Sequence, residues 1–295
     1  MSLGELIDGR AIAAQLQAET AARVAALKAR GIQPSLFFVR VGEDPASKVY
    51  VGMKEKDCAT LGILSRTQVL PVSTTQAELL ELLVRLNADP TIHGILVQAP
   101  LPKHISEAVV YSTVRPDKDV DGFNPVNVGK LMLGDSSGFA PCTPAGVLEL
   151  LVRSGVTIAG AEVVVLGRGN IVGKPMAAML CQKHRHADAT VTICHSRTRD
   201  IAAHCRRADI IVAALGAAEF LKADMVKPGA TVIDVGVNRI KDASAASGTR
   251  LVGDVDFAGV RAVAGKITPN PGGVGPMTRA VLMQNTVRAA ELIFP

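Results

Sequence analysis

A glycine-rich turn past the middle of the chain has the residue types and spacing that hold phosphate groups. In the segment VVVLGRGNIVGKP (163–175), Gly167, Gly169 and Gly173 stand between an apolar β-branched run and a Lys-Pro pair that can begin a helix. Glycines let the backbone approach a pyrophosphate, and a helix N-terminus favours its negative charge. The GxGxxxG spacing is one residue longer than the common fingerprint and also fits a purely structural turn, but the flanking strand and helix patterns favour a dinucleotide.

The end of the next predicted strand indicates which dinucleotide would bind. An NAD site usually places an acidic residue there to bind the ribose hydroxyls. This strand instead ends in CHSRT (194–198). Ser196, Arg197 and the loop cation Arg168 suit a 2′-phosphate, which a carboxylate would repel. The sequence therefore predicts NADP, the alternative being that Arg197 is an ordinary solvated residue.

Four polar residues in the first half could act on a second reactant. Tyr50 and Lys54 lie four apart on a predicted helix and share a face. By themselves they also fit a core-edge tyrosine beside a lysine that extends to solvent. Gln98 ends an apolar strand, where α/β proteins gather polar site groups, and Asp121 lies in a KDVDG loop. The segment PGGVGPMT (271–278) offers backbone amides to a ligand. The alternatives are a surface Asx-turn for the aspartates and ordinary turns for the glycines.

Alternating helix and strand patterns must position these residues. In the first half, helices are predicted over 8–30, 45–60 and 75–87, and strands over 35–41, 63–70 and 93–98. In the second half, helices are predicted over 144–153, 174–184, 199–206 and 279–292, and strands over 162–166, 189–194, 209–214 and 231–235. Thr143 is the expected cap of the first of these helices. Residues 116–125 and 267–278 are predicted to be irregular because proline, glycine and aspartate dominate them.

This order predicts an α/β protein with mostly parallel sheets and right-handed crossovers. The chain has 295 residues, which suggests two domains, and roughly 160 residues precede the glycine turn, enough for a separate domain. The net charge of +5 comes without a Lys/Arg run, which argues against nucleic acid. The five cysteines and six histidines show no metal-ligand spacing, so reduced thiols and no metal are expected. No signal pattern or membrane-spanning apolar run occurs, and a cytoplasmic protein is expected.

Taken together, the motifs resemble those of the bifunctional methylenetetrahydrofolate dehydrogenase/methenyltetrahydrofolate cyclohydrolase family. The resemblance covers essentially the whole chain and rests on motifs that occur in family order: VGEDPAS with the YxxxK pair, VQAPLP, KDVDG, PCTP, GRGNIVGKP, HSRT, DVGVN and PGGVGPMT. It implies NADP-dependent oxidation of 5,10-methylenetetrahydrofolate to the methenyl compound. Hydrolysis to 10-formyltetrahydrofolate, a step of one-carbon metabolism, would follow.

The resemblance also implies an architecture. An N-terminal three-layer α/β catalytic domain (residues 1–145) would bind the folate and be completed by a C-terminal helix (277–295). A Rossmann-like NADP-binding domain with a mostly parallel sheet would occupy residues 146–276. The family further suggests a cytoplasmic homodimer.

Residue roles follow from the matching motif positions. Lys54 matches the family's essential lysine, Tyr50 the aromatic residue that packs on the folate, Gln98 the glutamine near that lysine, and Asp121 the carboxylate that grips the pterin ring. These four are the expected catalytic residues. The expected substrate-binding positions are Tyr50, Gln98, Pro100, Asp121 and Gly273. The expected cofactor-binding positions are Gly167, Arg168, Gly169, Val172, Gly173, Ser196, Arg197, Thr198, Val237 and Thr278.

Three departures from the family pattern stand near these positions. The family commonly has serine where this chain has Gly169, and loss of that hydroxyl donor is expected to weaken NADP selectivity. Ala99 and Asn270 replace a leucine and a valine.

The sequence leaves three alternatives to this function: a shikimate dehydrogenase-like enzyme, a short-chain dehydrogenase and a non-catalytic nucleotide sensor. In short-chain dehydrogenases the YxxxK pair follows the nucleotide loop, whereas here it precedes it.

Overall fold

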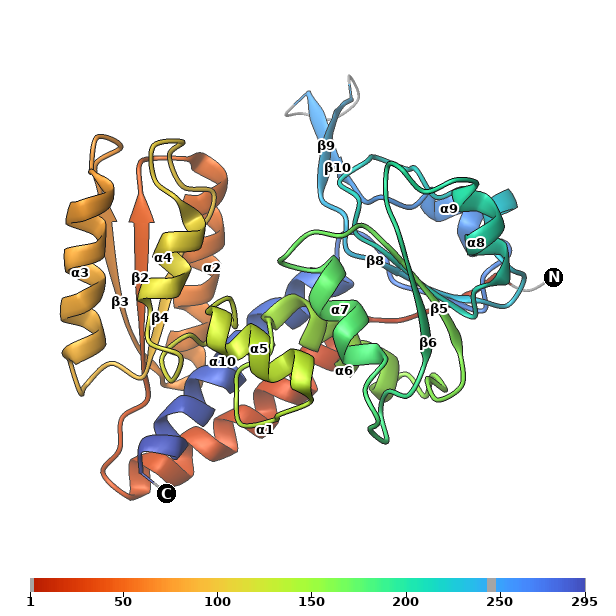
Figure 1. The fold of residues 1–295 in the computed structure, drawn as a ribbon. Coiled ribbons are helices and arrows are strands. Elements are labelled where there is room, and N and C mark those ends of the chain that lie inside the picture. The colour runs from red at the N-terminus through yellow and green to blue at the C-terminus, as the bar shows by residue number, and fades with distance from the viewer. Residues whose placement is uncertain (1–2, 243–247, 295) are drawn as a thin grey trace. The chain divides into compact units, whose positions relative to one another are not determined.

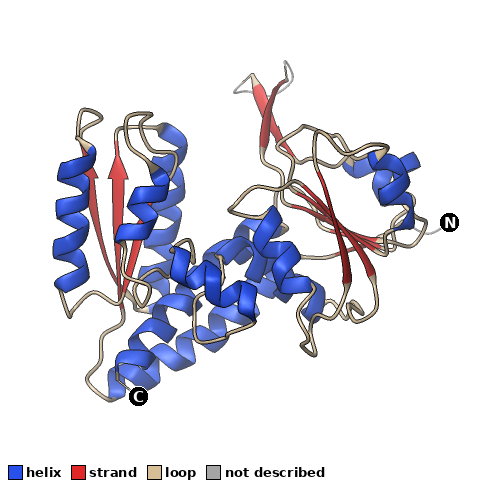
Figure 2. Ribbon diagram, viewed as in Figure 1, coloured by secondary structure: helices blue, strands red, loops and turns tan. Residues whose placement is uncertain are grey.

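Parallel strands form two separate sheets, and each sheet organises one unit of the chain (Figures 1 and 2). The computed structural model describes residues 3–242 and 248–294. We call Met1–Ala13 with Thr143–Thr278 the six-stranded unit, and Ala14–Cys142 with Arg279–Pro295 the three-stranded unit. The division falls inside two long helices, α1 (Gly9–Ala29) and α10 (Val274–Ile293).

The three-stranded unit has helices on both faces of its sheet, which makes three layers (Figure 1). Its strands have the order β3-β2-β4 and bounds β2 Ser35–Val41, β3 Leu64–Leu70 and β4 Gly94–Val97. Besides parts of α1 and α10, its helices are α2 (Pro45–Leu61), α3 (Gln76–Ala88), α4 (Glu107–Thr113) and α5 (Pro125–Leu133). Apolar side chains of α3 and α4 form a buried cluster with β2 and β4, whereas α2 packs on β2 and β3.

Local sequence signals account for the bounds of the helices that carry the first-half candidates. Asp44 caps α2 by accepting the Ser47 N–H at 2.7 Å, and Gly62 ends the helix at φ 74°. Thr75 and Glu78 form a reciprocal capping box at the start of α3. The helices predicted over 45–60 and 75–87 are therefore confirmed to within one residue at each end.

The six-stranded unit contains the parallel sheet β1-β11-β8-β7-β5-β6. The strand bounds are β1 Glu5–Leu6, β5 Glu162–Leu166, β6 Thr190–Cys194, β7 Ile210–Ala213, β8 Thr231–Asp234 and β11 Lys266–Ile267. Its other elements are α6 (Cys142–Arg153), α7 (Gly173–Leu180), α8 (Ile201–Arg207), the 3₁₀ turn Ala223–Met225, α9 (Phe257–Arg261) and the hairpin β9 (Asn238–Lys241)/β10 (Thr249–Val252). Strand β5 lies between β6 and β7, so the strand order reverses beside β5. Such a reversal is where doubly wound folds bind dinucleotides.

The structure corrects several predicted elements. Residues 267–278, predicted to be irregular, are not so throughout, because α10 already begins at Val274. Pro276 fits there, since N–H groups of a first turn have no intrahelical acceptor. Thr143 lies inside α6 instead of capping it, because the helix begins at Cys142. Helix α7 stops at Leu180 rather than 184, and a turn in which Asp188 N–H bonds the Gln182 carbonyl follows it.

Other elements had no predicted counterpart. Helices α4, α5 and α9, the β9/β10 hairpin and the two-residue strands β1 and β11 are short, and their patterns are too weak to predict them. Strand β1 pairs with β11, so residues 5–6 belong to the six-stranded unit, whereas the sequence grouped them with the first domain.

Candidate functional site

Lys54 and Gln98 come together at one end of the three-stranded sheet. Lys54 lies on α2, and Gln98 directly follows β4. The lysine Nζ donates a hydrogen bond of 3.0 Å to Gln98 Oε1. Gln98 Nε2 in turn donates to the Ala99 carbonyl at 2.6 Å, which fixes the orientation of the amide. The lysine is therefore partly buried and hydrogen-bonded, and does not extend freely into solvent as the alternative interpretation required.

Asp121 and Cys142 complete the electrostatic surroundings of this lysine. Burial lowers the pKa of Lys54, while the negative charge of Asp121 opposes the shift. Burial likewise raises the pKa of Asp121, opposed by the nearby Lys54. The Cys142 thiol is fully buried and donates to the Val120 carbonyl at 3.3 Å. Each member of this cluster is shifted toward its neutral form, which is a common property of groups that exchange protons in catalysis.

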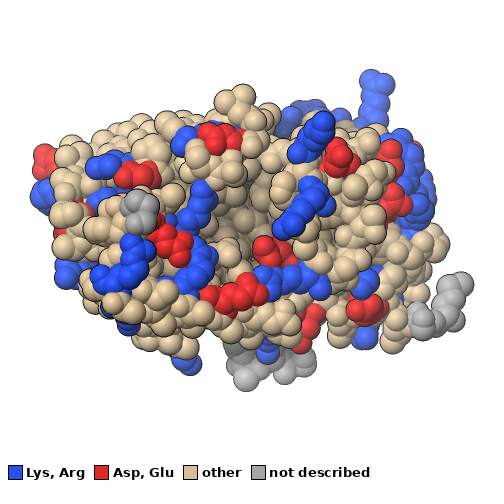
Figure 3. Space-filling model, turned by 90° about the horizontal axis from the view of Figure 1, so that it is seen from below, with Lys and Arg blue, Asp and Glu red and all other residues tan. Residues whose placement is uncertain are grey.

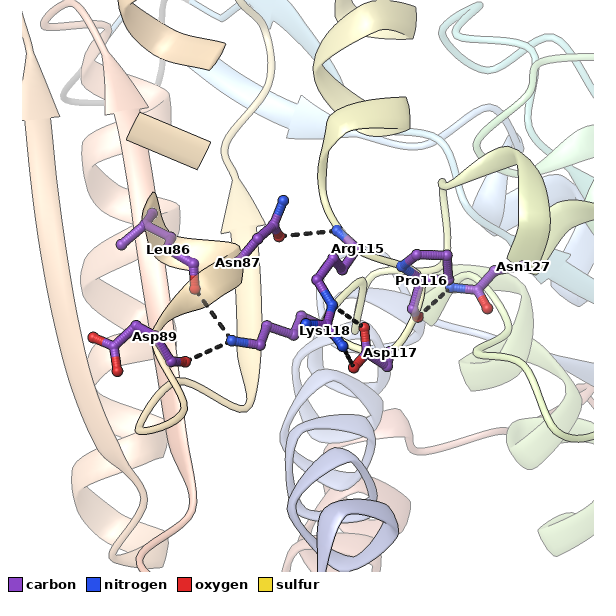
Figure 4. A network of polar contacts seen from close by, with 8 residues as sticks. All are labelled: Leu86, Asn87, Asp89, Arg115, Pro116, Asp117, Lys118 and Asn127. Atoms are coloured by element: carbon purple, nitrogen blue, oxygen red, sulfur yellow. Dashed lines mark hydrogen bonds and ion pairs between the residues drawn. The ribbon is translucent and has the colours of Figure 1, made fainter. Parts of the chain in front are cut away.

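The segment that carries Asp121 is anchored by buried polar side chains. Lys118 is 3% exposed, and its Nζ donates to the carbonyls of Leu86 and Asp89 at the end of α3, at 3.2 and 2.6 Å (Figure 4). The Asp119 carboxylate accepts hydrogen bonds from the N–H of Asn124 and the amide of Asn127. Burial raises the pKa of Asp119 to about 6. The surface Asx-turn interpretation is wrong for Asp119, which is an internal anchor of the loop.

Tyr50 and Pro100 remain accessible in the same unit. The Tyr50 side chain is 41% exposed on α2, one turn before Lys54. An exposed aromatic ring one turn from a partly buried polar pair is suited to stacking on a planar ligand. Pro100 is exposed and follows a cis peptide bond with Ala99. Of the expected first-half residues, Lys54, Gln98 and Asp121 therefore form one cluster, and Tyr50 lies beside it on α2.

Sequence reasoning missed two contributors to this cluster. Cys142 lies in the PCTP motif and Arg279 at the start of the helix predicted over 279–292, and the sequence assigns neither side chain a role at the site. Arg279 Nη1 forms an ion pair of 2.9 Å with Asp57, and its positive charge lowers the pKa of Lys54 further. The position of Cys142 within the PCTP motif was a usable signal, whereas nothing local marks Arg279.

The three glycines of the turn over residues 167–173 differ in how much space surrounds them. Gly167 has φ +115°, and a Cβ there would lie 2.1 Å from the Ala214 carbonyl oxygen. A Cβ on Gly173 would lie 2.3 Å from the Gly167 carbonyl oxygen. Gly169 has open space around it. The first and third glycines therefore permit close backbone packing, and the second is free to carry a side chain.

Two arginines follow neighbouring strand ends in this unit. Arg168 follows β5, Arg197 follows β6, and both are exposed. Arg168 Nη1 lies 3.4 Å from Nε2 of His195, and the exposed Ser196 separates His195 from Arg197. Thr198 Oγ1 accepts the His195 N–H at 2.9 Å and shapes this turn. Residues 194–199 contain no carboxylate, so the arrangement suits an anion.

The other expected cofactor positions lie elsewhere in the unit. Val172 precedes α7, whose first turn receives no side-chain cap. Val237 follows β8 and is 60% exposed. Thr278 Oγ1 lies 3.0 Å from Thr143 Oγ1. Gly273 is buried, and a Cβ there would lie 2.7 Å from the Pro269 carbonyl oxygen.

Comparison with known protein families decides which family this arrangement belongs to. Residues 7–121 match the family described as "Tetrahydrofolate dehydrogenase/cyclohydrolase, catalytic domain", and residues 141–294 match the corresponding "NAD(P)-binding domain". The chain belongs to the tetrahydrofolate dehydrogenase/cyclohydrolase family. It is 56% identical to the bifunctional protein FolD of Anaeromyxobacter dehalogenans, over 98% of this chain and 99% of that protein. It is 54% identical to FolD of Moorella thermoacetica, over 97% of this chain and 99% of that protein.

Solved structures of the family have the same fold. The bifunctional enzyme FolD from Campylobacter jejuni is 46% identical, with a TM-score of 0.93 over 98% of this chain and 99% of that chain. The Trypanosoma brucei enzyme, complexed with NADP cofactor and inhibitor, is 42% identical, with a TM-score of 0.93 over 99% of both chains. The expected family, two-domain α/β fold, enzyme class and NADP cofactor are therefore confirmed. Within residues 3–242 and 248–294, no helix is long and apolar enough to cross a membrane.

Proposed function

We propose that this chain oxidises 5,10-methylenetetrahydrofolate with NADP and then hydrolyses the methenyl product to 10-formyltetrahydrofolate. The three-stranded unit binds the folate and the six-stranded unit binds NADP. The observation that carries the proposal is the hydrogen bond between Lys54 and Gln98, with Asp121 close enough to affect the pKa of Lys54, in a chain of this family.

The oxidation places few demands on acid–base groups. A hydride leaves a carbon that stands between two nitrogens, and the resulting cation is delocalised over N–C–N. No general base is needed. The protein therefore accelerates this step mainly by positioning the folate carbon against the nicotinamide ring. NADP supplies the hydride acceptor. Tyr50 packs on the planar part of the folate, and Asp121 binds the pterin ring.

The hydrolysis requires proton transfer, and Lys54 is suited to it. Water adds to the cationic carbon and loses one proton, which leaves a hydroxyl group on that carbon. The bond from this carbon to N5 then breaks as N5 gains a proton and the hydroxyl loses its remaining proton to become the formyl carbonyl. A neutral Lys54 accepts the first proton and returns one to N5, and the overall step releases one proton to solvent. Burial already lowers the pKa of Lys54, and a cationic substrate nearby lowers it further. Gln98 orients the amine without holding it charged.

The cofactor residues divide into three groups, which contact the pyrophosphate, the 2′-phosphate and the nicotinamide. Gly173 and the start of α7 hold the pyrophosphate through backbone N–H groups, and Gly167, whose N–H donates to the Cys194 carbonyl, provides the close turn before them. Arg168, Ser196 and Arg197 bind the 2′-phosphate, with Thr198 shaping their turn. Val237 and Thr278 contact the nicotinamide side. Val172 and Gly169 line the phosphate turn, and Pro100 contributes backbone to the folate.

The assembly and location follow from family resemblance and composition. We propose that the protein is a cytoplasmic homodimer with reduced cysteines. Light scattering on the purified protein tests whether it is a dimer. Lys and Arg are interspersed with Asp and Glu on the face shown in Figure 3. Such mixed charge suits small anionic ligands better than a nucleic acid, whose partners carry a basic stripe.

A coupled assay tests the function directly. Purified protein is given methylenetetrahydrofolate with NADP or NAD, and methenyl absorbance and 10-formyltetrahydrofolate are followed together. We expect methenyl formation with NADP, its decay to the formyl product, and a lower catalytic efficiency with NAD. Binding of NADP without turnover would support the nucleotide-sensor alternative instead. Equal efficiency with both dinucleotides would overturn the NADP assignment.

A further inference from the structure

Two buried carboxylates in the six-stranded unit take no part in the chemistry above. Asp234 ends β8 and is 3% exposed, and Asp254 follows β10 and is 0% exposed. Burying a carboxylate is costly unless its oxygens accept several hydrogen bonds. The bonds that these two side chains accept therefore indicate what they hold in place.

Asp254 holds one loop by three consecutive backbone N–H groups. Its Oδ2 accepts from Leu215 at 2.5 Å and Gly216 at 2.9 Å, and its Oδ1 accepts from Ala217 at 2.9 Å. Oδ1 also accepts from the side-chain amide of Asn238 at 2.8 Å. Successive N–H groups that converge in this way form an anion-binding concavity, and here a side chain of the protein fills it.

The loop that Asp254 holds lies where the strand order reverses. Residues 214–217 follow β7, and β7 and β6 flank β5 on opposite sides. The Ala214 N–H donates to the Leu166 carbonyl at 2.8 Å, and the Ala214 carbonyl is the group that excludes a Cβ at Gly167. Residues 214–217 therefore border the glycine turn at the position where doubly wound folds bind a dinucleotide.

Asp234 links the loop after β8 to the same assembly. Its Oδ1 accepts the N–H groups of Gly236 at 3.0 Å and of Asp254 at 2.9 Å. A Cβ on Gly253 would lie 1.6 Å from Asp234 Oδ2, and one on Gly236 would lie 2.4 Å from Asp254 Oδ1. Two glycines thus leave room for the two carboxylates. The loops after β7 and β8 are fixed to one buried anionic centre.

We propose that Asp254 is a positioning residue for the nicotinamide half of the bound dinucleotide. The inference rests on the proposed role of this unit in binding NADP. The Asp254 carboxylate accepts hydrogen bonds from the backbone N–H groups of residues 215–217. It also accepts one from the side-chain amide of Asn238, which is adjacent to Val237 in the sequence. Without the carboxylate these N–H groups lose their acceptors and the loops no longer keep a single conformation. The adenosine half depends on Arg168, Ser196 and Arg197, none of which Asp254 contacts.

Calorimetric titration of full-length Asp254→Asn tests this role with two probes, NADP and 2′,5′-ADP, which lacks the nicotinamide. One amide oxygen cannot replace two carboxylate oxygens, so we expect the Kd for NADP to rise about tenfold or more. The Kd for 2′,5′-ADP stays within about twofold, because it reports only the adenosine half. The dehydrogenase KM for NADP rises in parallel, while kcat and KM of the cyclohydrolase step, which uses no NADP, stay unchanged.

Asp256→Asn is the matched control. Asp256 is a nearby carboxylate that caps α9 and contacts none of residues 215–217. If Asp254→Asn does not fold, Asn238→Ala carries the test, and it should raise the Kd for NADP about threefold or more. An unchanged Kd for NADP in the folded variant overturns the proposal. An equal loss of affinity for both probes also overturns it, since that result indicates general disruption of the unit. Failure of the wild-type protein to bind NADP would count against the proposed function itself.

Discussion

The amine of Lys54 donates to the amide oxygen of Gln98 at 3.0 Å, and the type of partner determines what this lysine can do. A carboxylate at the same place would hold the amine in its charged form. An amide oxygen accepts from either an amine or an ammonium group and, having no net charge, favours the charged form far less than a carboxylate would. The protonation of Lys54 is therefore set by burial, which lowers its pKa, and by the opposing charge of Asp121. This combination suits a lysine that must lose and regain a proton.

Replacing the amine should separate the two activities. We expect Lys54→Met to lower the cyclohydrolase kcat by about 10²-fold or more, because the proton acceptor is gone. The dehydrogenase step requires no base and should retain a much larger share of its rate. Stopped-flow measurement of each step separately provides the comparison. Lys56→Met, an exposed lysine on the same helix, is the control. Near wild-type hydrolysis in Lys54→Met would exclude Lys54 as the proton acceptor.

The pH dependence of hydrolysis should follow the protonation of Lys54. Because the neutral amine is the active form, kcat rises with pH through the lowered pKa of Lys54 and then levels off. Gln98→Glu places a negative charge at the hydrogen-bonding partner, which raises that pKa and moves the acid limb to higher pH. Activity lost at neutral pH should return in alkaline buffer. A pH–rate profile with an unmoved acid limb would contradict this account.

Removing Asp121 should affect the folate and spare the dinucleotide. We expect Asp121→Ala to abolish measurable folate binding and both activities, while the Kd for NADP stays within about twofold of wild type. Calorimetric titration with each ligand separates these effects. Asp117→Ala is the control, since Asp117 is an outer residue of the same loop and forms an ion pair with Arg115. Unchanged folate affinity in Asp121→Ala would refute the assigned role.

Local signals made much of the fold predictable from the sequence. Asp44, Thr75 and Gly62 begin or end helices through contacts within a few residues, which is why the bounds of the helices predicted over 45–60 and 75–87 are close to those observed. Strands β2, β4 and β5 were predictable because their apolar runs are bounded by polar or turn residues. The family motifs then supplied the candidate residues, and the structure brings Lys54, Gln98 and Asp121 together.

Features that depend on distant contacts were not predictable. Strand β1 exists only because Glu5 and Leu6 meet Lys266 and Ile267, and two residues carry no periodic pattern. Asp254 resembles an ordinary loop aspartate until residues 215–217 surround it with N–H donors. A side chain that anchors remote backbone leaves no mark in its local sequence.

The preference for NADP should depend on Arg197. We expect Arg197→Leu to lower kcat/KM with NADP about 10- to 100-fold, the cost of losing a charge-assisted hydrogen bond, and to leave NAD unaffected. Steady-state kinetics with both dinucleotides measure the ratio. Arg199→Leu, which removes an exposed cation two residues further on, controls for the general loss of positive charge. Equal losses with NADP and NAD would show that Arg197 does not contact the 2′-phosphate.

Serine substitutions at Gly169 and Gly167, two glycines of the same turn, should have opposite effects on the protein. The family commonly has serine at position 169, and a Cβ at Gly169 would meet no atom within 4 Å. Gly169→Ser should therefore leave the thermal midpoint unchanged and, by adding a hydroxyl donor, lower the Kd for NADP about threefold to tenfold. Gly167→Ser should lower the thermal midpoint, because φ is +115° there and its Cβ would lie 2.1 Å from the Ala214 carbonyl oxygen. Calorimetry and thermal melts of both variants measure the contrast. If a fully folded Gly169→Ser variant binds NADP more weakly, the prediction is wrong. That result would show that the added hydroxyl does not donate to the phosphates and that the turn binds them through its backbone alone.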